Sequence, residues 1–95
     1  MTREDAIRII EAELDLALEK WPDWPSDPIH AAAVVAEEAG ELVQAALDAT
    51  YSEDSDWENA KLQTEAAQVG AMAIRMLMGI NRYMPEKSKP IAKPW

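Results

Sequence analysis

The sequence predicts an all-α fold, a bundle of three main helices in one small domain. Ala, Leu, Ile and Met supply most apolar residues, whereas Phe is absent and only 3 of the 95 residues are Gly, which favours helix over strand. Apolar residues also recur at three- and four-residue spacing, the period of an amphipathic helix. Because a chain of this length buries only a limited core, we expect oligomerisation to complete the bundle.

The first predicted helix runs from Thr2 to about Lys20. Thr2 is a good N-cap, and Asp5 three residues later completes a variant of the capping box. The connector 21–28 follows, and its three prolines cannot continue a helix. Its tryptophans, Trp21 and Trp24, either pack over the end of the bundle or form an aromatic wall for a base or a partner.

The second predicted helix begins with Asp27 as N-cap and Pro28 at the first helical position, and it ends near Thr50. After a polar loop, Ser55 is the expected N-cap of a third helix, with Glu58 completing a capping box. These signals predict two long helices joined by a short loop, an arrangement that favours an antiparallel hairpin.

The third helix is expected to continue to about Arg82, with two distinct faces. One is an apolar stripe, which we expect to form the core: Leu62, Ala66, Val69, Ala73, Met76, Leu77 and Ile80. The other is a polar strip that contains Glu58, Lys61, Glu65, Gln68, Met72, Arg75 and Gly79. Gly70 lies among alanines and could mark a close contact between helices. The predicted domain covers residues 1–84, followed by a basic, proline-containing tail over 85–95.

Composition excludes several classes of function. Without cysteine, the chain forms no disulfide, zinc–thiolate site or cysteine nucleophile. The net charge of −9 argues against binding nucleic acid through phosphates. No long apolar run suggests a membrane span and no signal-peptide pattern is present, so a cytoplasmic protein is expected. Residues 1–60 carry 16 acids and 3 bases, whereas residues 61–95 carry 6 bases and 2 acids.

Carboxylates on the second and third helices are candidates to hold a metal ion. Glu38 and Glu41 are three residues apart and share a helix face, among small apolar neighbours. Glu65 and Gln68 have the same spacing on the third helix, and 23 residues separate Glu41 from Glu65, which suits a hairpin that brings the pairs together. Mg²⁺ favours such oxygen ligands. The alternative is that these acids lie on ordinary solvated faces.

These residues resemble a known family. The order Glu38-x-x-Glu41, 23 residues, then Glu65-x-x-Gln68 is similar to the motif of the MazG-like all-α nucleoside triphosphate pyrophosphohydrolases. The sequence of residues 35–45 is close to the first motif of this family. Residues 68–75 look like the second-motif helix of its short, phage-type members. The resemblance covers roughly residues 28–82.

The resemblance implies Mg²⁺-dependent cleavage of a nucleoside triphosphate to a nucleoside monophosphate and pyrophosphate, with Mn²⁺ as a possible substitute, by a homodimer or homotetramer. By motif position, Glu38, Glu41 and Glu65 would be the catalytic metal ligands, with Gln68 as a fourth ligand.

Further residues are candidates for substrate binding. Charge and placement suggest Lys61, Arg75 and Arg82 for the phosphates, and Trp24 suits a base. His30, the only histidine, could contact substrate or act as a base, or could be an ordinary surface or packing residue.

One departure from the family pattern bears on activity. The family has Asp where this chain has Gln68, and an uncharged amide should weaken metal binding or reduce a two-metal site to one. Glu37 or Asp48 could compensate. The alternative function is therefore a non-catalytic module of the same fold that binds nucleotide or protein. The preferred base or sugar is not predicted by the sequence.

Overall fold

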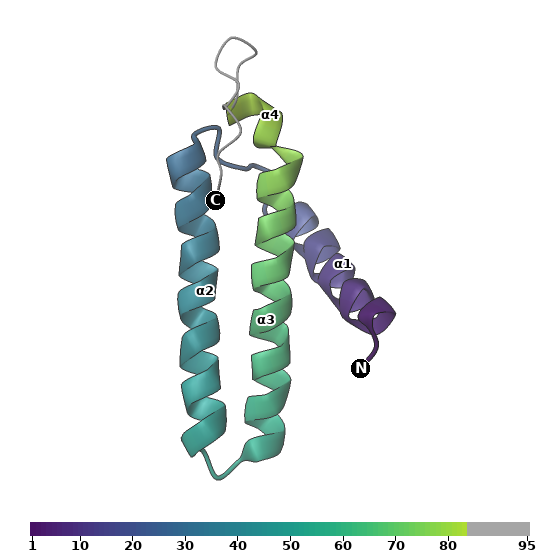
Figure 1. Ribbon diagram of the computed structural model, residues 1–95, viewed down its shortest axis with the longest axis vertical. Helices are drawn as coiled ribbons and strands as arrows, with labels where there is room; N and C mark the ends of the chain where they lie inside the picture. Colours follow the sequence, from purple (N-terminus) through teal and green to yellow (C-terminus); the bar gives the residue numbers. More distant parts are fainter. Residues whose placement is uncertain (84–95) are drawn as a thin grey trace, which may run out of the picture.

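A computed structural model describes residues 1–83 and contains four helices in this part of the chain, with no strand (Figure 1). The helices are α1 (Arg3–Lys20), α2 (Pro28–Tyr51), α3 (Ser55–Met78) and the short α4 (Ile80–Tyr83). The predicted all-α class and the three main helices are confirmed. The predicted tail, 85–95, lies outside the described residues.

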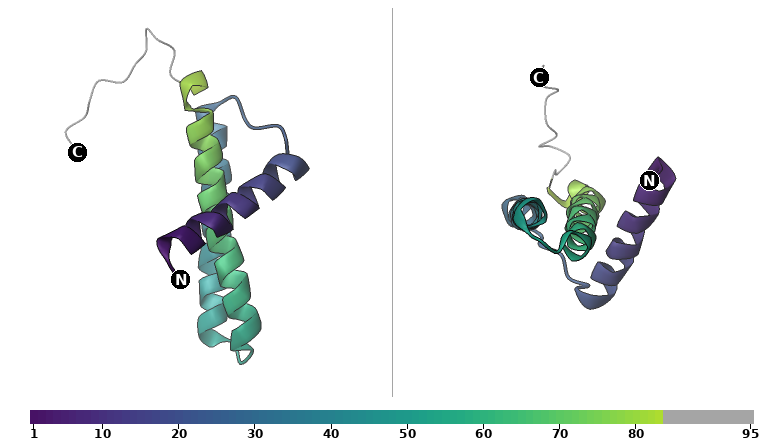
Figure 2. Two further views of the ribbon diagram at one scale, coloured as in Figure 1. Left: turned by 90° about the vertical axis from the view of Figure 1, so that its right-hand side faces the viewer. Right: turned by 90° about the horizontal axis from the view of Figure 1, so that it is seen from below.

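Helices α2 and α3 form an antiparallel hairpin, and α1 crosses α3 obliquely (Figures 1 and 2). The view along the hairpin axis shows α3 in the middle, with α2 on one side and α1 on the other (Figure 2). Helix α3 packs against both neighbours. The result is an elongated molecule of 54 × 31 × 25 Å, in which one side of α2 meets no other described helix.

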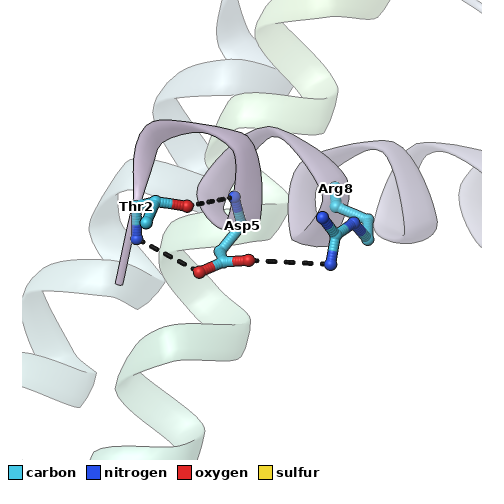
Figure 3. A network of polar contacts seen from close by, with 3 residues as sticks. All are labelled: Thr2, Asp5 and Arg8. Carbon is cyan, nitrogen blue, oxygen red and sulfur yellow. Dashed lines mark hydrogen bonds and ion pairs between the residues drawn. The ribbon is translucent and has the colours of Figure 1, made fainter.

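The predicted start of α1 is confirmed (Figure 3). The backbone N–H of Asp5 donates to Thr2 Oγ1 at 3.1 Å, and the Thr2 backbone N–H donates to the Asp5 carboxylate at 3.2 Å. The second oxygen of Asp5 lies 3.6 Å from the guanidinium of Arg8. Asp5 thus satisfies helix-end donors and places negative charge at the positive end of the helix dipole.

Helix α2 begins as predicted, with the Asp27 side chain accepting from the backbone N–H groups of Ile29 and His30. The N-cap predicted for α3, Ser55, was wrong by one residue. Asp54 is the N-cap and accepts from the N–H of Trp57, and its own N–H donates to Ser52 Oγ. The carboxylate one residue earlier caps the helix and offers charge to its N-terminus.

The predicted end of the third helix, near Arg82, is also corrected. Helix α3 ends at Met78 with Gly79 as C-cap, and α4 follows. Gly79 has a ψ of 2°, which turns the chain away from helical geometry. A Cβ on Gly79 would lie 3.3 Å from the hydroxyl of Tyr83, so glycine permits this tight turn onto α4.

The core of the protomer is small and made of alanine. Its fully buried apolar residues in the described region are Ala31, Ala45, Ala67 and Ala71, and no large side chain is completely buried. The apolar stripe predicted as the core of α3 is only partly correct, since Leu62, Val69, Met76 and Ile80 are half-buried. Its other three members are exposed: Ala66, Ala73 and Leu77.

The reason for this correction is that α3 contacts two helices on different sides. Part of the face predicted to be polar therefore becomes interior, including Arg75 and Gly79. The suggestion that Gly70 marks a close approach is confirmed, because a Cβ there would lie 2.9 Å from Cδ1 of Ile10 on α1. Of the helices in residues 1–83, none combines the length and hydrophobicity needed to cross a bilayer.

Candidate metal centre

The hairpin brings Glu38, Glu41 and Glu65 together. Each offers one carboxylate oxygen, and these three oxygens all lie within 4.8 Å of one another. Glu38 and Glu41 come from adjacent turns of α2, and Glu65 comes from the facing turn of α3. The juxtaposition expected from the 23-residue separation is thus present.

Two of these carboxylates are partly buried, and one oxygen of each lacks a hydrogen-bond partner. Glu38 and Glu65 are half-buried, and Oε2 of each is buried with no hydrogen-bond partner. Burial, followed by the negative charges of Glu41 and Glu65, raises the pKa of Glu38. Burial and the charge of Glu41 likewise raise the pKa of Glu65, partly offset by the positive charge of Lys61. The negative charge of the cluster is therefore only partly compensated by the described residues.

A divalent cation fits this donor set. Mg²⁺ binds carboxylate oxygens at about 2.1 Å, so ligands on opposite sides of the ion lie roughly 4.2 Å apart, slightly closer than the present limit of 4.8 Å. Adjacent ligands of an octahedral ion lie closer still, about 3 Å apart, so the three oxygens would have to move together by a small rearrangement to share one ion. An ion would also satisfy the unpartnered oxygens of Glu38 and Glu65.

A cleft of about 1050 Å³ lies between α1, the connector and the hairpin, and of the three clustered carboxylates only Glu38 lines it. Glu38 and Gln68 lie on its wall, so the amide predicted as a fourth ligand is in the same cleft as the first carboxylate. Trp24, Val34 and Met72 give the wall an apolar portion. A cleft with carboxylates and an apolar surface suits a ligand that has both a cation-binding group and a flat or apolar part.

Arg75 has a structural environment that the sequence did not reveal. Its side chain is only 5% exposed, and one guanidinium nitrogen donates to the carbonyls of Trp21 and Asp23 at 2.7 and 3.2 Å. The guanidinium also lies 4.8 Å from the centre of the Trp24 ring. These contacts tie the connector to α3, and no sequence spacing signals them because 52 and 54 residues separate the partners.

Trp24 and Tyr83 extend this attachment. Trp24 Nε1 donates to the hydroxyl of Tyr83 at 2.9 Å, and that hydroxyl donates to the carbonyl of Pro25 at 2.7 Å. Trp24 thus packs over the end of the bundle, one of the two alternatives, while its side chain also lines the cleft. The two uses are compatible, because one edge of the ring is anchored and part of its surface faces the cleft.

The other predicted site residues lie elsewhere. His30 and Lys61 are exposed and do not line the cleft. Arg82 is exposed and borders a smaller cavity beyond Trp24. Of the two acids proposed to compensate for Gln68, Glu37 lines the cleft, whereas Asp48 accepts from the Gln44 amide at 3.0 Å. Neither belongs to the group of three carboxylates.

Glu58 is a feature that the sequence analysis did not interpret as a site residue. Its Oε2 is also buried without a hydrogen-bond partner, near the start of α3. Its position in the first turn places the carboxylate near the positive end of the helix dipole, which partly compensates its charge.

No protein-family model, curated protein or solved structure matches this chain. The resemblance to the MazG-like family therefore stays a prediction from the two motifs.

Proposed function

We propose that the protein is a Mg²⁺-dependent nucleoside triphosphate pyrophosphohydrolase that releases a nucleoside monophosphate and pyrophosphate. The observation that carries the proposal is the group of Glu38, Glu41 and Glu65, with oxygens within 4.8 Å of one another beside a cleft of about 1050 Å³. The motif resemblance and an expected cytoplasmic location agree with a nucleotide-pool hydrolase. Assembly as a homodimer or homotetramer is part of the proposal.

The three carboxylates would hold the ion between α2 and α3. A divalent cation there would neutralise phosphate charge and polarise a phosphoryl oxygen. The chain's own contribution is positioning: the hairpin fixes the carboxylates, and the Arg75 contacts fix the connector that forms the cleft wall. Trp24 and Met72 offer apolar surface for the base. Two exposed cations could contact phosphates: Lys61, one turn from Glu65, and Lys20, which lines the cleft.

Pyrophosphate release from a panel of ordinary and modified nucleoside triphosphates, with Mg²⁺ or Mn²⁺, tests this function. We expect metal-dependent release that falls at least about 100-fold in Glu38→Ala and Glu65→Ala, because each change removes a charged ligand. Glu53→Ala is the matched control, since Glu53 is exposed in the loop at the far end of the hairpin. Release that persists unchanged in both site variants would rule the proposal out.

A second candidate function is a non-catalytic module that binds nucleotide or protein. Gln68 favours it, because an amide replaces the charged ligand of the family pattern. The contacts of Arg75 also favour it, because one guanidinium nitrogen of this predicted phosphate ligand already donates to two connector carbonyls. Gln68→Asp separates the two candidates: a hydrolase with a weakened site gains rate and metal affinity, whereas a binding module gains metal affinity without release of pyrophosphate.

A further inference from the structure

The guanidinium of Arg75 is a buried cation at the boundary of two cavities. The side chain is only 5% exposed, and it lines both the large cleft and the smaller cavity beyond Trp24. No carboxylate within residues 1–83 forms an ion pair with it. A buried charge without a counter-ion is costly unless its donors find acceptors. Any donor of Arg75 that the protein does not use is therefore available to a ligand in the cleft.

The protein uses only one nitrogen of this guanidinium. Nη2 donates to the carbonyls of Trp21 and Asp23 at 2.7 and 3.2 Å, whereas Nε and Nη1 make no hydrogen bond within the described residues. Bidentate binding of a phosphate or carboxylate pairs Nη2 with either Nε or Nη1. Because Nη2 is already shared between two carbonyls, Arg75 is poorly suited to a bidentate phosphate contact. It is suited to a single hydrogen bond with a neutral acceptor, such as a ring carbonyl.

Asp23 places an acceptor beside these donors. Its backbone carbonyl is bonded to Arg75, and its exposed side chain lines the same cleft. The carboxylate makes no ion pair with the described residues. An ionised carboxylate only accepts hydrogen bonds, whereas a guanidinium only donates them. The connector end of the cleft thus offers a donor next to an acceptor.

Trp24 gives this end of the cleft an anchored aromatic surface. The centre of its ring lies 4.8 Å from the Arg75 guanidinium, and its Nε1 donates to the Tyr83 hydroxyl at 2.9 Å. Both contacts hold the ring in place, and Trp24 also lines the cleft. An aromatic surface beside one donor and one acceptor suits a flat, polar heterocycle.

The connector end lies away from the metal centre. Arg75 follows Glu65 on α3 and is about 15 Å further along the helix axis, and it is about 10 Å beyond Gln68. A nucleotide whose phosphates lie at the carboxylates therefore extends its base, rather than a phosphate, towards Arg75. This role differs from the phosphate contact that the charge of Arg75 suggested.

We infer that Arg75 and Asp23 together select nucleotides whose base carries a ring carbonyl next to a ring N–H, the edge shared by guanine, hypoxanthine, uracil and thymine. Arg75 donates to the carbonyl, and Asp23 accepts from the N–H. Adenine and cytosine carry an amino group and an unprotonated ring nitrogen at these places, so a donor meets Arg75 and an acceptor meets Asp23. The inference rests on the proposed function only in taking a nucleotide as the ligand.

Calorimetric titration with four uncleavable analogues tests this selection: the α,β-methylene triphosphates of inosine, adenosine, uridine and cytidine, each with Mg²⁺. Inosine differs from adenosine, and uridine from cytidine, only at the edge in question. We expect the carbonyl member of each pair to bind at least about 10-fold more tightly. In Asp23→Asn the preference should fall below about 3-fold, because an amide can also donate to the ring nitrogen of the amino base.

Two further variants complete the test. Arg75→Lys should also lower the preference below about 3-fold, because a single ammonium cannot hold the connector and reach the base at once. Glu19→Gln is the matched control, since it removes one negative charge from another part of the cleft wall and should leave the preference unchanged. Asp23 is exposed, so Asp23→Asn decides the matter even if Arg75→Lys does not fold.

Several results would overturn the inference. They are equal binding of the two members of either pair, tighter binding of the amino member, no binding of any analogue, and a preference that survives in both Asp23→Asn and Arg75→Lys. Pyrophosphate release is a separate readout. Release from nucleotides without a base preference in binding overturns this inference alone, whereas selective binding without release overturns the hydrolase and leaves the selection by Arg75 and Asp23 intact.

Discussion

Glu38 and Glu65 lie in an environment that favours their protonated forms in the absence of a cation. Their pKa values are raised by burial first and by neighbouring carboxylates second. Ordinary helix-surface acids would not show two buried oxygens without partners. The sequence predicted which acids meet, because residue spacing fixes helix faces and the hairpin. It did not predict their burial, which depends on how the facing helix covers them.

A pH dependence of stability follows from these shifts. A carboxyl whose folded pKa is above the ordinary value of 4.5 binds protons more tightly when folded, so its contribution to the free energy of unfolding falls as pH rises through that window. Without metal, Glu38→Gln and Glu65→Gln should therefore gain stability relative to the native chain between about pH 5 and neutrality. We expect roughly 0.5 kcal/mol each from lost like-charge repulsion.

Urea unfolding in a chelator, at mildly acidic and at neutral pH, measures this effect. The Glu53→Gln variant is the control, because Glu53 is exposed in the loop. Equal losses of stability in Glu38→Gln and Glu65→Gln at both pH values would contradict the account of the cluster.

Outside the cluster, substitution of Arg75 is expected to have the largest effect on stability. Arg75→Met removes both bonds to the connector carbonyls and the stacking on Trp24. The free energy of unfolding should fall by about 2 kcal/mol, since two part-buried hydrogen bonds to the connector and the contact with the Trp24 ring are lost. Arg82→Met, at an exposed position on α4, should cost little. Urea unfolding monitored by tryptophan fluorescence compares the two, and equal stabilities would show that the connector is held in another way.

At the scale of the elements, the start of a helix was predictable where the sequence offers a single good N-cap residue. Thr2 with Asp5 and Asp27 with Pro28 capped their helices as predicted. The start of α3 was missed by one residue because Asp54 and Ser55 are both good caps, and the loop bond from Asp54 N–H to Ser52 Oγ selects the former. The inward face of α3 was only partly predictable, since one helix packs against two partners.

The Asp54 cap makes a direct prediction. Asp54→Ala should lower the free energy of unfolding by about 1 kcal/mol, because the N–H of Trp57 loses its acceptor. Glu53→Ala, one residue earlier in the same loop, should leave stability nearly unchanged. Thermal unfolding followed by circular dichroism compares the two variants. A loss of similar size in both would mean that α3 is not capped by Asp54.

The contact of α1 with α3 predicts a second element-scale effect. Gly70→Val should destabilise the chain by about 2 kcal/mol, because the added atoms would overlap Ile10. Shortening the partner in Gly70→Val/Ile10→Ala should recover part of the loss, as a double-mutant cycle in urea would show. If the destabilisation by Ile10→Ala simply adds to that by Gly70→Val, the two residues are not in contact.

At the scale of the whole molecule, the protomer combines an alanine core with a cleft and an uncovered helix face. The all-α class was predictable because composition and periodicity agree throughout the chain. The cleft was not predictable, because it depends on the angle at which α1 crosses α3 and on the path of the connector that Arg75 fixes. The exposed side of α2 was not predictable either, because it depends on where α3 packs against that helix.

The most direct test of the central claim is titration of the native chain with Mn²⁺, followed by electron paramagnetic resonance of the free ion. We predict saturable binding that Mg²⁺ competes away and that Glu38→Gln and Glu65→Gln each weaken at least about 10-fold, while Glu53→Gln does not. Binding of equal strength in all four proteins, or no saturable binding by the native chain, would contradict a metal centre at Glu38, Glu41 and Glu65.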